Sequence, residues 1–139
     1  GCAAGVCAPC DDDGPLLVLG TGELGYMQTN NGDSVGVYAG HQGGHHVFGA
    51  FRLYNAVQRS NTVQHWRVVD GDVELAVWDT FGNLMDEGDH AVFFGETVMF
   101  FLGTQPADLN GRQVRLTLTL EVDNTSAHDE RDIILRWPP

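Results

Sequence analysis

A strict alternation of apolar and polar residues near the end of the chain is the feature that most constrains the fold. Every second residue from 114 to 122 is aliphatic, and the residues between them are polar. The aliphatic positions are Val114, Leu116, Leu118, Leu120 and Val122. A repeat of two residues is that of a β-strand with one buried face, so this strand must pack against a second layer. Ile133, Leu135 and Trp137 alternate in the same way and predict a closing hairpin, with residues 123–129 as its turn-rich connection.

The rest of the chain also favours strands over helices. Further extended segments are expected at 15–20, 24–28, 34–39, 45–57, 63–69, 73–79, 90–94 and 97–102. Turn signals such as Asn31-Gly32, Asp70-Gly71 and Asn110-Gly111 separate these segments at intervals of roughly ten residues. The 18 glycines also point to many turns, and no window has helical periodicity. We therefore predict an all-β chain, an immunoglobulin-like antiparallel β-sandwich.

The length of 139 residues suits a single domain with one core. We expect residues 1–14 to form a short leader rich in Cys and Asp, and residues 15–139 to form the sandwich. The longest apolar runs, 91–94 and 98–102, are too short to cross a bilayer, which takes about 20 residues. The sequence thus predicts no transmembrane segment.

The chain is strongly acidic, with a net charge of −12 and seven basic residues that are all arginine. A surface of this sign repels nucleic acid and anionic lipid headgroups, so neither is an expected partner. Divalent cations and basic partners fit the charge better. On other grounds, the expected partners are other protein chains, including further copies of this one.

All three cysteines, Cys2, Cys7 and Cys10, lie in the leader. An odd number allows one internal disulfide and leaves one thiol for a partner chain or a lipid. Cys7 and Cys10 have the C-x-x-C spacing, but Asp and Gly follow rather than the helix of a redox motif. We therefore expect a disulfide or tether in an oxidising compartment, which means a secreted, cell-surface or periplasmic protein.

The Gly1-Cys2 pair is typical of a bacterial lipoprotein precursor around its cleavage point, with Cys2 as the lipid-bearing residue. A lipid anchor is therefore a further expectation. While Gly1 stays attached, Cys2 is not the lipidated amino terminus of this form of the chain.

Three segments together resemble a known group of domains. They are Leu17–Gly22, the stretch Gln42–Arg52 (Q-G-G-H-H-V-F-G-A-F-R), and the hairpin from Leu109-Asn110-Gly111-Arg112 to Glu130-Arg131. In order, they are similar to uncharacterised secreted, lipoprotein-type bacterial domains of immunoglobulin-like build, in which a Q-G-G-x-H motif opens a central strand. The resemblance implies a fold and a location but no activity. This chain differs in having His45 at a position that is usually aromatic, and in adding His41.

The histidine cluster His41, His45 and His46 is the one group with the donor types and closeness that a metal site requires. His45 and His46 are adjacent, so a regular strand would point them to opposite faces. The Gly43-Gly44 pair could bring His41 and His45 together, with His90, His65 or a carboxylate as a further ligand. Copper or zinc would be the ion of such a site, but the preferred interpretation is that His46 packs at the strand entry while His41 and His45 are solvated. A blue-copper site is excluded, because residues 15–139 contain no cysteine.

Other chemistry finds less support in the sequence. The acidic clusters at 11–13, 70–72, 86–89 and 129–130 fall at expected turns or termini and match no calcium-binding loop, so solvated turns are preferred to calcium sites. Ser34 follows Gly-Asp but lacks a nucleophile elbow. Trp78 is the aromatic residue that alternation would leave outside the core, where it could contact a sugar.

Two function classes follow. The leading hypothesis is a non-enzymatic extracellular or cell-surface module, structural or adhesive, that is tethered through its leader and assembles through open strand edges. The alternative is a copper- or zinc-binding protein of the periplasm or cell surface that uses the cluster at 41–46.

Overall fold

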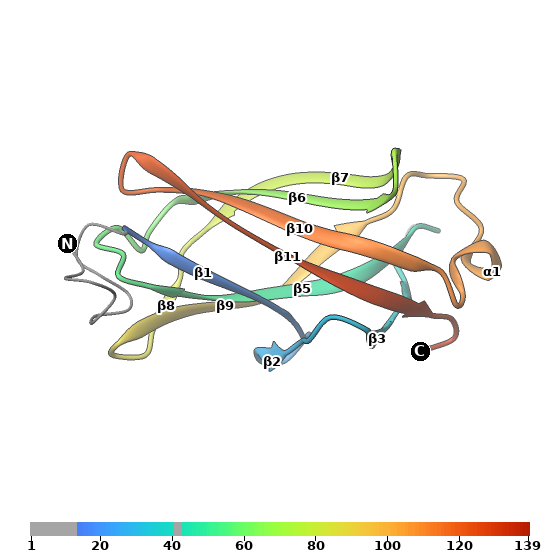
Figure 1. Ribbon diagram of the computed structural model, residues 1–139, viewed down its shortest axis with the longest axis horizontal. Coiled ribbons are helices and arrows are strands. Elements are labelled where there is room, and N and C mark those ends of the chain that lie inside the picture. The colour runs from blue at the N-terminus through green and yellow to red at the C-terminus, as the bar shows by residue number, and fades with distance from the viewer. Residues whose placement is uncertain (1–13, 41–42) are drawn as a thin grey trace, which may run out of the picture.

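The computed structural model describes residues 14–40 and 43–139, which form two β-sheets stacked face to face (Figure 1). Sheet A has six strands in the order β2-β1-β5-β9-β8, with β4 also paired to β5. Its strands are β1 (Leu16–Thr21), β2 (Met27–Gln28), β4 (Tyr38–Ala39), β5 (His45–Tyr54), β8 (Met85–Asp86) and β9 (His90–Met99). The all-β prediction is confirmed, and the two sheets are those of a β-sandwich.

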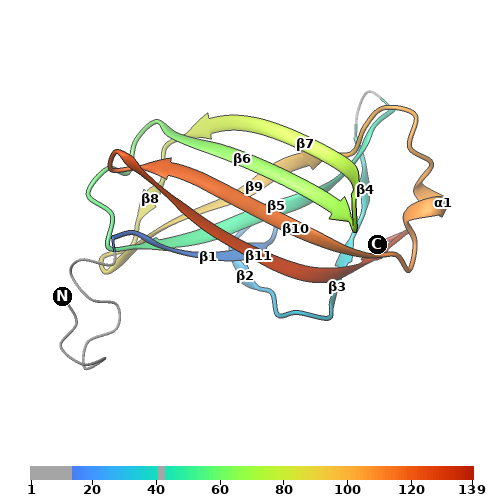
Figure 2. The same ribbon diagram turned by 45° about the horizontal axis from the view of Figure 1, so that its top comes forward.

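Sheet B has five strands in the order β3-β11-β10-β6-β7. They are β3 (Asp33–Gly36), β6 (Thr62–Asp70), β7 (Val73–Gly82), β10 (Gln113–Val122) and β11 (Thr125–Arg136). One helical turn that the sequence did not predict, α1 (Pro106–Leu109), precedes β10 and lies at the same end of the sandwich as the carboxyl terminus (Figure 2). Within the described ranges, no helix has the length and apolar character needed to span a membrane.

The closing hairpin is confirmed, with a shorter turn than the sequence indicated. Strands β10 and β11 pair in an unbroken register from Gln113↔Ile134 to Val122↔Thr125. The turn consists of Asp123 and Asn124, with φ of 52° and 58°. Both values are typical of a two-residue hairpin turn, in which Asn and Asp tolerate positive φ. Residues 125–129 therefore belong to β11 rather than to a turn.

The alternating aliphatic residues of β10 are all buried, as predicted, with exposures of 0 to 4%. They pack in the core with Trp66 of β6, which is fully buried. The Trp66 ring lies against β5 at Gly49, where an added Cβ would come within 2.5 Å of it. Because the ring and this backbone touch, the core requires a residue without a side chain at position 49.

The predicted strand at 34–39 is divided between the two sheets. β3 pairs with β11, from Asp33↔Ile133 to Gly36↔Arg136, and β4 pairs with β5. Val37 lies between these two strands and is fully buried. The β3–β11 pairing is parallel, so the expectation of wholly antiparallel sheets is wrong for sheet B.

A β-bulge in β7 explains why Trp78 lies inside rather than outside. Ala76 pairs with Val68, but Val69 pairs with Glu74, so Leu75 is an extra residue on β7. An extra residue reverses which face the following side chains point to. Trp78 is consequently the register partner of the buried Trp66 and packs against the core.

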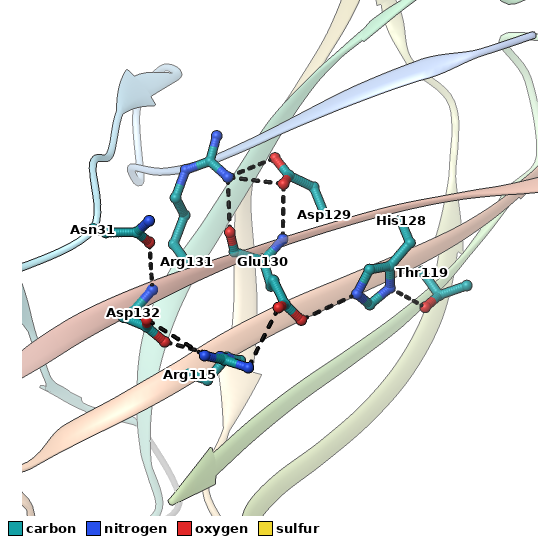
Figure 3. A network of polar contacts seen from close by, with 8 residues as sticks. All are labelled: Asn31, Arg115, Thr119, His128, Asp129, Glu130, Arg131 and Asp132. Carbon is teal, nitrogen blue, oxygen red and sulfur yellow. Dashed lines mark hydrogen bonds and ion pairs between the residues drawn. The ribbon is translucent and has the colours of Figure 1, made fainter. Parts of the chain in front are cut away.

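Asp129 and Arg131, which Figure 3 shows paired with each other, join the two sheets along one side of the sandwich. The Asp129 carboxylate in β11 accepts a hydrogen bond of 2.8 Å from the backbone N–H of Leu19 in β1. Arg131 donates to Asp129 at 2.8 Å and to the backbone carbonyl of Thr29 at 2.8 Å. We call these contacts the β1–β11 staple, because they connect sheet A to sheet B through side chains.

Candidate functional site

The described histidines of the predicted metal cluster point in opposite directions. The His45 ring packs edge-on against Trp137, with ring centroids 5.0 Å apart, towards sheet B. The His46 ring packs edge-on against Phe48 at 4.7 Å and stacks on Tyr38 at 6.3 Å. Adjacent residues of a strand cannot bind one ion together when their side chains leave on opposite faces, as the sequence indicated.

His46 is buried, and the Nδ1 atom of its ring has no hydrogen-bond partner. Burial lowers the pKa of His46 below its ordinary value of 6.5, because the charged imidazolium loses its solvation. The Cα register partner of His46 is Met99 of β9, so a thioether lies on the same face of the sheet. The ring is therefore neutral near pH 7, and its Nδ1 atom is buried without a partner.

His90 does not lie near this cluster. It pairs with Tyr54 at the far end of β5, and the ten residues of β5 span roughly 30 Å. Both ring nitrogens of His90 are occupied, Nδ1 by Asp89 at 2.7 Å and Nε2 by Glu87 at 2.9 Å. The prediction that His90 supplies a further ligand to His45 or His46 is therefore wrong on distance.

The remaining predicted residues are only partly covered by the structure. His41, Cys2, Cys7 and Cys10 lie outside the described residues. Within 14–40 and 43–139, no three His, Cys, Asp or Glu side chains converge as metal ligands. The acidic turns at 70–72 and 86–89 and the pair 129–130 each contribute a carboxylate that binds an arginine instead: Arg112, Arg59 and Arg131.

The outer face of sheet B carries a polar network that crosses β10 and β11 (Figure 3). Arg115 donates to Asp132 at 2.8 Å and lies 3.4 Å from Glu130. Glu130 in turn contacts His128 at 3.3 Å, and the other ring nitrogen of His128 contacts the Thr119 hydroxyl at 2.9 Å. Hydrogen bonding to Arg115 holds the pKa of Asp132 below its usual range. These exposed groups satisfy one another, as cross-strand polar pairs do.

His65 occupies a similar position on β6, between two carboxylates. Its Nε2 contacts Glu121 of β10 at 2.5 Å, and its Nδ1 contacts Asp79 of β7 at 2.9 Å. The hydrogen bonds to Glu121 and then to Asp79 raise the pKa of His65 above 6.5. A protonated imidazole donates to both carboxylates at once, which a neutral ring cannot do. His65 thus connects three neighbouring strands.

Next to His65 lies an open basin with a volume of about 820 Å³. It is bounded by the β10–β11 turn and by the loop between β5 and β6, which meet at one end of the sandwich (Figure 2). Amide and hydroxyl side chains make up most of its lining, including Gln58, Asn61, Asn124, Thr125 and Ser126. Its volume exceeds those of three other concave features of the described residues, which are about 360, 160 and 120 Å³.

The second notable surface feature is the edge of sheet B formed by β7. β7 pairs with β6 along one side, and no strand of the described chain pairs with its other side. Phe101 donates one backbone hydrogen bond to Leu75 at 3.0 Å, at the β-bulge. The stretch from Ala76 to Gly82 is left as an open edge, with the Phe81 side chain 70% exposed.

Comparisons with known proteins add little to this description. No protein-family model matches the sequence, and no curated protein matches it. Among solved structures, the N-terminal domain of PorA is similar over 84% of this chain and 96% of that domain, with 10% sequence identity and a TM-score of 0.31. A similarity this low supports no conclusion about fold or function.

Proposed function

We propose that this protein is a non-enzymatic structural or adhesive module of immunoglobulin-like arrangement, and that copies of it assemble by pairing through the β7 edge. The observation that carries the proposal is the open stretch Ala76–Gly82, whose backbone N–H and C=O groups have no neighbouring strand on one side. The two stacked sheets, with hairpin turns at both ends, support the immunoglobulin-like arrangement.

The composition of this edge favours pairing. Natural edge strands are commonly protected by lysine, proline or a bulge. The bulge of β7 lies at Leu75, outside the open stretch, and residues 76–82 contain neither lysine nor proline. An added strand would gain main-chain hydrogen bonds and would place its own side chains beside the apolar side chain of Phe81.

A second copy of the chain is the proposed occupant. Asp79 is the only charged residue between Ala76 and Gly82, and its carboxylate contacts His65, so a second copy would meet a single, already paired charge along this edge. Two β7 strands related by a two-fold axis would pair antiparallel, and the two Asp79 carboxylates oppose each other only if the axis passes through that residue. Closed symmetric dimers of this kind are the commonest oligomers.

Sedimentation velocity over a range of concentrations tests this assembly. We expect the wild type to form dimers or larger species as concentration rises, and Val77→Lys on the open edge to remain monomeric. The matched control is Gln113→Lys, which adds the same charge on the central strand β10. A wild type that stays monomeric throughout, or equal loss of assembly in both variants, would refute the proposal.

Export and tethering are the second part of the proposal. They are supported by the position of Cys2, Cys7 and Cys10 ahead of the sandwich, where a disulfide or thioether would not disturb the core. Mass spectrometry of natively isolated protein should find at least one disulfide, and one further sulfur attached to a partner chain or lipid. Three free thiols would contradict an oxidising location.

The alternative proposal is a copper- or zinc-binding protein that uses the histidines of 41–46. The unpartnered Nδ1 of His46, together with the neighbouring thioether of Met99, favours it. Titration calorimetry with Cu(II) or Zn(II) should then show a saturable site that is lost in His41→Ala and His46→Ala but kept in His128→Ala. Equal effects of all three variants, or no saturation, would exclude this function.

A further inference from the structure

The basin beside His65 is held in shape by hydrogen bonds to the backbone of the loop that lines one side of it. The Asp123 carboxylate accepts hydrogen bonds from the backbone N–H groups of Val57 and Gln58, at 2.8 and 2.6 Å. The side-chain oxygen of Asn83 accepts another from the N–H of Asn61 at 2.9 Å. These bonds connect the loop between β5 and β6 to the β10–β11 turn and to the end of β7. A preformed site loses less entropy when a ligand binds.

The lining of the basin is polar and carries little free charge. Its ten residues, all within the described chain, include no arginine, and the two ionisable groups, His65 and Glu121, pair with each other at 2.5 Å. Nothing in the basin is therefore suited to an anionic ligand, which would need arginine or lysine donors. The amides and hydroxyls offer donors and acceptors together, which match the hydroxyl groups of a neutral ligand.

An exposed aromatic ring borders the same basin. Val63 lines the basin, and its register partner on β7 is Phe81. Cross-strand partners in an antiparallel pair lie on the same face with Cβ atoms roughly 5 Å apart, so the Phe81 ring stands on the outer face next to the basin. The ring is 70% exposed, although a phenylalanine is normally buried.

We propose that this basin binds a neutral oligosaccharide. Its hydroxyl groups would bond to the amides and hydroxyls of Gln58, Asn61, Asn124, Thr125 and Ser126, and the C–H face of one sugar ring would pack on Phe81. The combination of clustered amides, a carboxylate with one oxygen left to accept, and a flat apolar ring fits a ligand that alternates hydroxyl groups with C–H faces. The site goes beyond the structural function, because it does not require pairing through β7.

NMR titration of the full chain labelled with ¹⁵N tests the site, with cellotetraose, maltotetraose and fully N-acetylated chitotetraose as separate neutral probes. We expect at least one of them to give saturable shift changes at residues 58–63 and 121–126, with a dissociation constant on the order of 1 mM because the basin is open and shallow. The same titration with Val77→Lys keeps the protein monomeric, so that failure of assembly and failure of sugar binding are distinguished.

Two pairs of variants locate the ligand. Phe81→Ser should weaken binding about threefold to tenfold through loss of ring packing, while Phe101→Ser, at an aromatic residue 48% exposed outside the basin, should leave it unchanged. Ser126→Trp fills the basin and should abolish binding, whereas Gln113→Trp at another exposed position of the same sheet should not.

The proposal is overturned by any of three results. The first is the absence of saturable shift changes with all three saccharides. The second is unchanged affinity in Ser126→Trp, which would place the ligand elsewhere. The third is tighter binding of a heparin tetrasaccharide or of spermidine than of any neutral probe, which would show that the basin selects a charged ligand.

Discussion

Replacing Asp129 by alanine should destabilise the protein more than replacing any exposed carboxylate of the same sheet. The Asp129 side chain is 21% exposed and accepts hydrogen bonds from the backbone N–H of Leu19 and from Arg131, each at 2.8 Å. It also accepts one from the N–H of Glu130 at 2.9 Å. Leu19 is fully buried, so water does not readily replace the carboxylate at its N–H.

The magnitude follows from these contacts. A hydrogen bond to a charged group contributes about 1.5 to 3 kcal/mol, and a buried donor left unpaired costs about 1 to 3 kcal/mol. The exposed N–H of Glu130 can bond to water and adds little. We therefore expect Asp129→Ala to lower the free energy of unfolding by about 2 to 4 kcal/mol. With 139 residues, the unfolding entropy is roughly 0.3 kcal/mol/K, so Tm should fall by about 7 to 14 °C.

Urea denaturation followed by tryptophan fluorescence and differential scanning calorimetry measure this loss. Asp132→Ala is the matched control, because Asp132 also lies on β11 and pairs with an arginine, Arg115 of β10, but is on the outer face with its side chain 55% exposed (Figure 3). Asp132→Ala should have little effect, since exposed ion pairs contribute little. If the two variants lose equal stability, the β1–β11 staple does not join the sheets as described.

Three further predictions concern single positions. The raised pKa of His65 means that the folded state holds its proton more tightly than the unfolded state does. The resulting gain in free energy of unfolding is present below pH 6.5 and is lost as pH rises through the higher folded pKa. Urea titrations at several pH values should show this loss in the wild type and not in His65→Gln. The lowered pKa of His46 has the opposite sign, so stability should fall as pH drops below 6.5 towards the folded pKa, and His46→Phe should flatten the acid side of the same profile. Gly49→Ala should lower Tm by several degrees, because its Cβ would lie 2.5 Å from the fully buried Trp66 ring. Gly111→Ser is the control, because nothing lies within 4 Å of its Cβ and its φ of +80° should cost only backbone strain. Equal Tm for wild type and Gly49→Ala would contradict this packing.

The strands with a clear period of two were predictable from the sequence, and the connections between sheets were not. The alternation at 114–122 predicted β10 and its buried face, because one strand with one buried side determines that pattern by itself. The passage of the chain from sheet B to sheet A at Val37 left no such pattern. Residues 34–39 are extended throughout, and only the partners of β3 and β4 reveal the change of sheet.

The candidate site was missed for a related reason. Without the bulge at Leu75, the turn after Asp70 would pair His65 with residue 78, and β7 would place no carboxylate beside it. The extra residue moves Asp79 into that position and turns Trp78 inward. A single inserted residue thus determined the contact between His65 and Asp79 and turned the predicted sugar-binding tryptophan inward. Periodicity alone does not reveal where a bulge falls. The opposite directions of His45 and His46, by contrast, follow from strand geometry and were predicted correctly.

The change of sheet at β3 also affects how the chain folds during its synthesis. β3 pairs with β11, which lies about a hundred residues later in the sequence, as in the pair Asp33↔Ile133. This edge of sheet B therefore cannot form until β11 has left the ribosome. β11 also carries Asp129, so the N–H of Leu19 has no side-chain acceptor until β11 is in place. Contacts this distant in sequence form slowly, whereas sheet A can begin from β1, β5 and β9. A chain truncated before β11 should therefore be recognised by chaperones, because β3 and one edge of β10 would both lack their partner strand.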